Sequence, residues 1–130
     1  MKKLITYWLP PILWASGIFY LSGLSGLASN MTVFWDVFWR KLFHAIEFGV
    51  LNLLLWRALF YGESINFKKA LGWSLFLTIL YAASDELHQY FVPNRQCRWQ
   101  DVMQDSLGSV AMTGGIFLLQ RIGILKERQN

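Results

Sequence analysis

The chain has 130 residues, of which 55% are hydrophobic, 17% aromatic and only 15% charged, whereas an ordinary soluble domain is roughly 25% charged. This composition excludes a multidomain enzyme and a disordered chain, and it leaves room for about four membrane spans of about 20 residues each. The formal net charge of +4 comes from basic residues scattered in ones and twos. We therefore expect no nucleic-acid partner, because a binding surface for nucleic acid needs a basic stripe.

The first predicted element is an uncharged run at residues 4–24, preceded by Lys2 and Lys3. We interpret it as a membrane-spanning helix in which Pro10 and Pro11 start or kink the helix near the interface. A cleaved signal peptide is the alternative interpretation. The apolar run is longer than the usual 7 to 15 residues of a signal peptide, which favours an uncleaved anchor.

Three further spans are predicted at residues 41–60, 70–90 and 102–123. The last two have uncharged cores of about 15 residues, and the first is apolar from Leu42 to Trp56 except for His44, Glu47 and Asn52. Each helix therefore has to carry some polar residues into the membrane or its interface. A soluble four-helix bundle would show a polar stripe along the whole of each helix, whereas here the polar residues collect at one end. We expect an all-α fold, a single membrane domain at residues 1–130 with four transmembrane helices.

The basic residues predict the orientation of this bundle. With four spans, both termini and the middle loop share one side of the membrane, and that side holds eight basic residues. The opposite side holds four, which are Arg40, Lys41, Arg95 and Arg98. The positive-inside rule therefore places both termini in the cytoplasm.

Six of the eight acidic residues and both histidines fall on the outer side or in the outer turns of the predicted helices. An ionised side chain below the interface costs about 2.5 to 3.5 kcal/mol on insertion scales, so these groups should face one another. Helical spacing places several of them on shared helix faces. Gly108 and Gly115 continue the acidic face of the last helix and predict close approach of a neighbouring helix. The predicted site comprises Lys41, His44, Glu47, Asp85, Glu86, Gln89, Arg95, Arg98, Asp101 and Asp105.

Three motifs contain most of these residues. They are Lys41-x-x-His44 followed by Phe48, then Asp85-Glu86-x-x-Gln89-x-Phe91-x-Pro93-x-Arg95, and Asp101-x-x-x-Asp105-x-x-Gly108. Together with the Leu21-Ser22 end of the first helix, they resemble the VanZ-like family of small bacterial membrane proteins. The resemblance implies a multi-pass protein of the bacterial cytoplasmic (inner) membrane. It also implies a link to low-level resistance against the glycopeptide teicoplanin, for which no chemical mechanism is established.

The chain departs from the family pattern at four positions. Phe48 stands where Tyr is usual, Asn94 where Gly is common, Asp105 where Asn is frequent, and Met112 where a second small residue often follows. The first change removes a hydroxyl donor from the polar cluster, and Asp105 adds a negative charge to it.

The polar cluster predicts binding of a lipid headgroup or a lipid-linked cell-wall precursor at the outer leaflet. Arg95 and Arg98 would contact phosphate or carboxylate. His44, Asp85 and Glu86 are candidate proton-transfer groups, but the sequence has no Gly-x-Ser-x-Gly nucleophile, and Cys97 lacks the setting of a reactive thiolate. Whether the protein is an enzyme therefore stays open.

Several alternatives remain. The histidines and carboxylates could form a mixed nitrogen and oxygen metal site, although no His-Glu-x-x-His signature is present and no cofactor is required by the sequence. The charges could also form a purely structural network that fixes the helices together. Transport would need an oligomer, because the inner halves of the predicted spans carry charge only near their ends, at Arg57 and Arg121, and leave no continuous polar path within one chain.

Overall fold

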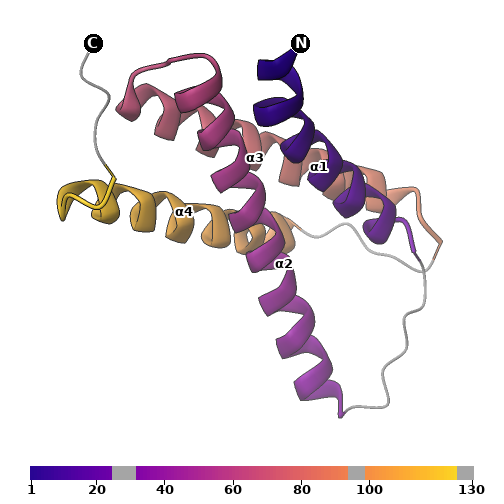
Figure 1. Cartoon of the computed structure of the whole chain (residues 1–130). Coiled ribbons are helices and arrows are strands. Elements are labelled where there is room, and N and C mark those ends of the chain that lie inside the picture. The colour runs from indigo at the N-terminus through magenta and orange to yellow at the C-terminus, as the bar shows by residue number, and fades with distance from the viewer. Residues whose placement is uncertain (25–31, 94–98, 126–130) are drawn as a thin grey trace.

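The computed structural model describes residues 1–24, 32–93 and 99–125, and this part of the chain is helical with no strands (Figure 1). An all-α fold is therefore confirmed. The four α-helices are α1 (Leu9–Ser22), α2 (Val33–Arg57), α3 (Phe67–Tyr90) and α4 (Trp99–Arg121). Two π-helical turns, η1 (Leu4–Trp8) and η2 (Ala58–Gly62), precede α1 and extend α2.

Local sequence shapes the first turns of α1 and of α3. Pro10 and Pro11 lie in the first turn of α1, which continues directly from η1, and as prolines they donate no backbone hydrogen bond there. The side chain of Asn66 accepts a 3.0 Å hydrogen bond from the backbone N–H of Lys68, which caps the N-terminus of α3. The junction between η2 and α3 is thus a short turn that reverses the chain.

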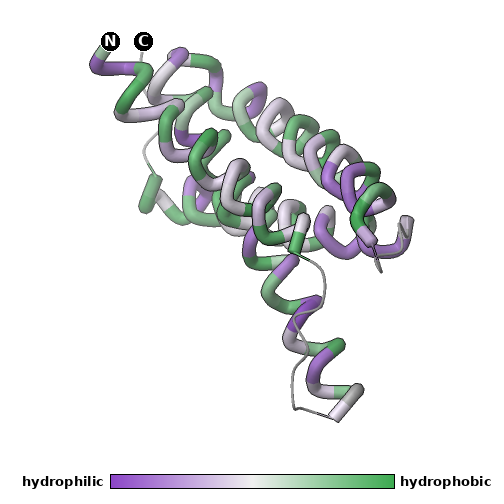
Figure 2. Tube along the Cα trace, turned by 90° about the vertical axis from the view of Figure 1, so that its right-hand side faces the viewer, coloured by the Kyte–Doolittle hydropathy of each residue, from purple (hydrophilic) through white to green (hydrophobic). Residues whose placement is uncertain are grey.

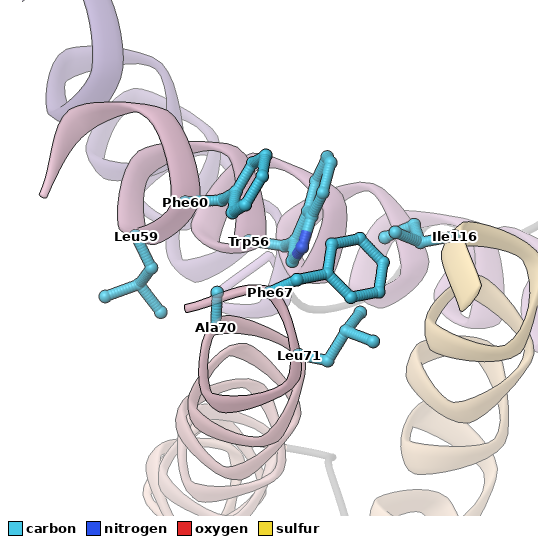
Figure 3. Close-up of a cluster of buried hydrophobic side chains, with 7 residues drawn as sticks. All are labelled: Trp56, Leu59, Phe60, Phe67, Ala70, Leu71 and Ile116. Carbon is cyan, nitrogen blue, oxygen red and sulfur yellow. The ribbon is translucent and has the colours of Figure 1, made fainter. Parts of the chain in front are cut away.

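One end of the bundle, here called the Glu63 end, joins η1, η2 and the start of α3. The indole nitrogen of Trp8 donates a 2.7 Å hydrogen bond to Glu63. The guanidinium carbon of Arg57 lies 5.2 Å from the ring centre of Tyr7. A hydrophobic core supports this end (Figure 3), with Trp56, Leu59, Phe60, Phe67, Ala70, Leu71 and Ile116 as its buried members.

Three helical stretches are long and apolar enough to cross a membrane, namely Leu4–Ser22, Phe34–Gly62 and Trp99–Arg121. They match three of the four predicted spans. The remaining helix, α3, is more polar, and its polar residues Ser74, Thr78, Asp85, Glu86 and Gln89 are buried. These side chains face the protein, which explains how α3 tolerates them.

Helices α2 and α4 approach each other closely at Gly108. A methyl group built at Gly108 would lie 1.9 Å from the carbonyl oxygen of Ala45, and one built at Gly49 would lie 3.2 Å from the carbonyl oxygen of Gly108. Glycine is therefore required at Gly108 for the two backbones to meet. The prediction of close packing is confirmed at Gly108 but is wrong for Gly115, which has no atom within 4 Å of such a methyl group.

The N-terminal part of α2 projects beyond the other three helices (Figures 1 and 2). The helix begins at Val33, well before residue 41, where the sequence predicts the second span to start. The projecting turns expose large aromatic side chains, which are Phe34, Trp35, Phe38, Trp39 and Phe43. Figure 2 shows hydrophilic residues on the turns of α3 and α4 beside this projection. This polar end of the bundle is here called the Asp85 end.

Candidate functional site

Asp85 is the most deeply buried acidic residue of the Asp85 end, with 2% of its surface exposed. The hydroxyl of Ser22 donates a 2.7 Å hydrogen bond to its Oδ1 atom, and the amide nitrogen of Gln89 donates a 3.0 Å bond to its Oδ2 atom. Each carboxylate oxygen thus has one donor, which compensates part of the cost of burying it. Asp85 therefore joins α1 to α3.

His88 occupies the same junction on its more exposed side. Its ring stacks on Phe19 with 4.0 Å between ring centres, and its Nδ1 atom lies 3.5 Å from the hydroxyl of Ser22. These contacts hold His88 against the end of α1. They support a positioning role for this histidine.

The second histidine, His44, lies between two carboxylates of different helices. Its Nδ1 atom is 3.7 Å from Oε2 of Glu47 and 3.9 Å from Oδ1 of Asp105. Both distances exceed the reach of a hydrogen bond, and the Nδ1 atom is buried without a hydrogen-bond partner. The geometry leaves room for a further polar group to bridge the imidazole and the two acids.

A cavity of about 210 Å³ opens beside His44 and is here called the polar cavity. Helix α2 supplies its cationic side, and α3 and α4 supply its acidic side. The lining residues are Val37, Arg40, Lys41, His44, Glu86, Gln89, Asp101, Gln104 and Asp105. The volume is below the roughly 300 to 1,000 Å³ of sites for drug-sized ligands, so the cavity suits a small charged group.

A second, mostly apolar cavity of about 610 Å³ runs between α2 and α4 and is here called the apolar groove. It is lined by Phe38, Lys41, Leu42, Ala45, Gln100, Met103, Gln104 and Leu107. Lys41 and Gln104 line both spaces. The polar cavity and the apolar groove are therefore neighbours that share one wall.

The structure brings six of the ten predicted site residues to the polar cavity. These are Lys41, His44, Glu86, Gln89, Asp101 and Asp105. Asp85 is linked to the cavity through Gln89, whereas Glu47 contacts His44 and also lines an apolar space beside α1. Arg95 and Arg98 lie outside the described residues, as does Cys97.

The sequence places Arg40 on the outer side and includes Ser22 in the family resemblance, but the predicted site residues include neither of them, nor Gln104. Arg40 forms a 2.9 Å ion pair with Asp36 one helical turn earlier, and it lies next to Lys41 in the chain. Gln104 follows Asp101 by three residues, so helical spacing could have placed it on the acidic face. The bond from Ser22 to Asp85 joins residues 63 positions apart, and no local pattern indicates it.

The alternative of a metal site gains no support from this geometry. Within residues 1–24, 32–93 and 99–125, no group of three or more His, Cys, Asp or Glu side chains is arranged to hold a metal ion.

The fold and the site define a small helical protein with three membrane-span-capable helices and a charged cavity at one end of the bundle. A family model described as VanZ/LLP1 matches residues 5–120. The chain belongs to this family, as the three sequence motifs predict. No match is found among curated proteins or among solved structures.

Proposed function

We propose that the protein binds the headgroup of a membrane lipid in the polar cavity, with the acyl chains of that lipid in the apolar groove. The observation that carries this proposal is the shared wall formed by Lys41 and Gln104. A soluble polar ligand would need only the polar cavity. A lipid needs a charged pocket and an apolar channel side by side, and both are present here.

The charges and the size of the polar cavity support a small headgroup. Arg40, Lys41 and His44 can contact a phosphate group, and about 210 Å³ is too little space for a sugar-peptide unit. A lipid-linked cell-wall precursor would therefore place only its phosphate region in the cavity. A phospholipid could place its whole headgroup there.

We further propose that the bundle crosses the cytoplasmic membrane of a bacterium four times, with both termini in the cytoplasm. Helix α3 has 24 residues, which at 1.5 Å per residue is about 36 Å and exceeds a hydrocarbon core of about 30 Å. Its charged residues lie near its two ends, with Lys68 and Lys69 at the start and Asp85 and Glu86 near the finish. In this orientation the polar cavity faces the outer leaflet.

Membership of the VanZ/LLP1 family supports a link to glycopeptide resistance. Glycopeptides act outside the membrane, so a headgroup site in the outer leaflet is placed where it could change the envelope surface that the antibiotic meets. The proposal requires binding alone. Proton transfer by His44, Asp85 or Glu86 is not needed for it.

The test is lipid binding by the purified full-length protein in detergent, followed by native mass spectrometry. The probes are palmitoyl-oleoyl phosphatidylethanolamine and the matching phosphatidylglycerol. We expect lipid-bound protein with the wild type and at least tenfold less with Lys41→Ala. Lys68→Ala is the matched control, because Lys68 is equally an exposed helical lysine but lies at the Glu63 end. Equal loss in both variants, or equal binding by both, would contradict the assignment of the site.

A further inference from the structure

The polar cavity has two walls of opposite charge. Arg40, Lys41 and His44 come from α2, whereas Glu86, Asp101 and Asp105 come from α3 and α4. We propose that the ligand is a zwitterion of the phosphoethanolamine class, with its phosphate on the α2 wall and its primary ammonium group on the acidic wall. This inference rests on the proposed function and specifies the chemical class of its lipid.

The acidic wall of the polar cavity favours binding of a cation. Asp105 is 4% exposed and lines the cavity, yet its carboxylate accepts no side-chain hydrogen bond from the described residues. Among the residues that the structure describes, the basic nitrogen paired with Asp105 is the Nδ1 atom of His44, at 3.9 Å. A buried carboxylate without a donor is costly, and Asp101, one helical turn earlier, adds repulsion. A positively charged donor in the cavity would relieve both.

The cationic wall is where a phosphate fits. Lys41 is exposed, and it forms no ion pair with any residue that the structure describes. It stands at the boundary between the polar cavity and the apolar groove. The order along this surface is therefore apolar groove, lysine, cavity and acidic wall. The covalent order in a phosphoethanolamine lipid is the same, with acyl chains, phosphate and ammonium group in sequence.

The chemistry of the wall also favours a primary amine over a trimethylated one. A primary ammonium group has three N–H donors, as in lysine, and can serve the carboxylates of Asp101 and Asp105 together. A choline headgroup has no N–H donor and is recognised by aromatic rings around its cation. In the described part of the chain, no Phe, Tyr or Trp side chain lines the polar cavity.

The experiment is a titration of the full-length protein in detergent with lipids that share palmitoyl-oleoyl chains and differ only in headgroup. The headgroups are phosphoethanolamine, its N-methyl and N,N-dimethyl forms, phosphocholine and phosphoglycerol. We expect affinity to fall with each added methyl group, by about tenfold over the whole series. Equal affinities, or strongest binding of phosphoglycerol, would overturn the zwitterion inference and leave lipid binding intact. Absence of binding by every lipid would overturn the proposed function as well.

Two variants locate the ammonium site. Asp101→Asn and Asp105→Asn should each abolish the preference for phosphoethanolamine over phosphocholine without lowering phosphocholine binding. Glu63→Gln removes a carboxylate at the other end of the bundle and should preserve the preference. If Asp105→Asn does not fold, Asp101→Asn decides the test, because Asp101 is only partly buried. A preference that survives Asp101→Asn would overturn the inference.

A competition experiment distinguishes a lipid from a soluble ligand. Free phosphoethanolamine should compete only weakly with the lipid for the polar cavity. Competition as strong as that of the lipid would overturn the lipid assignment and indicate a soluble ligand.

Discussion

The hydroxyl of Ser22 donates a 2.7 Å hydrogen bond to the Oδ1 atom of Asp85, and both side chains are buried between α1 and α3. Two other bonds attach α1 to its neighbours. The hydroxyl of Tyr81 donates to the carbonyl oxygen of Ala15 at 2.6 Å, and the indole nitrogen of Trp14 donates to that of Glu47 at 2.9 Å. Apolar contacts between helices gain little hydrophobic free energy in lipid, so polar bonds of this kind help to hold α1 in place.

Ser22→Ala should therefore destabilise the protein. The substitution leaves Oδ1 of Asp85 without this donor, and loss of a bond to a buried charged group costs about 1 to 3 kcal/mol in the free energy of unfolding. Thermal unfolding of the purified protein in detergent measures the effect. Ser84→Ala is the control, because the exposed Ser84 donates, among the residues that the structure describes, to the carbonyl oxygen of Tyr81 in its own helix. Equal stability of the two variants would contradict this account.

The contact between Gly108 and Ala45 makes a second prediction about stability. Gly108→Ala forces a methyl group against the backbone of α2, so the helices must separate, at a cost of about 1 to 3 kcal/mol. Gly114→Ala on the same helix meets no atom within 4 Å and should stabilise α4 by about 0.5 to 1 kcal/mol. Unfolding midpoints of the two variants should shift in opposite directions. A shift in the same direction would show that α2 and α4 do not meet at Gly108.

The orientation of the bundle can be measured with reporters. Green fluorescent protein should fluoresce when fused to either terminus, and alkaline phosphatase, which is active only outside the cytoplasm, should be inactive at both. In a Cys97→Ser background, Phe34→Cys should react with a maleimide that cannot cross the membrane, because Phe34 is 71% exposed on the projecting turns of α2. Lys68→Cys should not react in intact cells. Phosphatase activity at either terminus would contradict the proposed topology.

Filling the apolar groove should weaken binding in a way that depends on acyl chain length. Leu107→Trp places a larger side chain in the groove and should lower the affinity for palmitoyl-oleoyl lipid more than for a six-carbon lipid with the same headgroup. Leu118→Trp is the matched control, because Leu118 lies on the same helix with 62% exposure against 66% for Leu107 and does not line the groove. Identical chain-length dependence in both variants would place the acyl chains elsewhere.

Much of the Asp85 end is predictable from the sequence because helical spacing is local. Asp101 and Asp105 are one turn apart, and the rule for membrane helices requires such charges to face protein or water. The same spacing brings Lys41 and His44 onto one face of α2. Relations between helices are harder to predict, because they depend on how each helix tilts and rotates.

Two features depend on such relations between helices. One is the bond between Ser22 and Asp85, and the other is that Lys41 and Gln104 line both cavities. The early start of α2 was missed for another reason. Trp and Phe residues at 34–39 suit a membrane interface whether or not the chain is helical there. At Gly115 the sequence predicts a close contact that the structure lacks. A small residue permits close packing, but the contact forms only where a neighbouring helix passes that position.

The most direct test of the account is an experimental structure of the full-length protein crystallised from a lipidic mesophase doped with palmitoyl-oleoyl phosphatidylethanolamine. We expect phosphate density beside Lys41, ammonium density between Asp101 and Asp105, and acyl-chain density along Met103 and Leu107. A polar cavity filled by side chains of the protein itself, with lipid density only elsewhere on the surface, would contradict it.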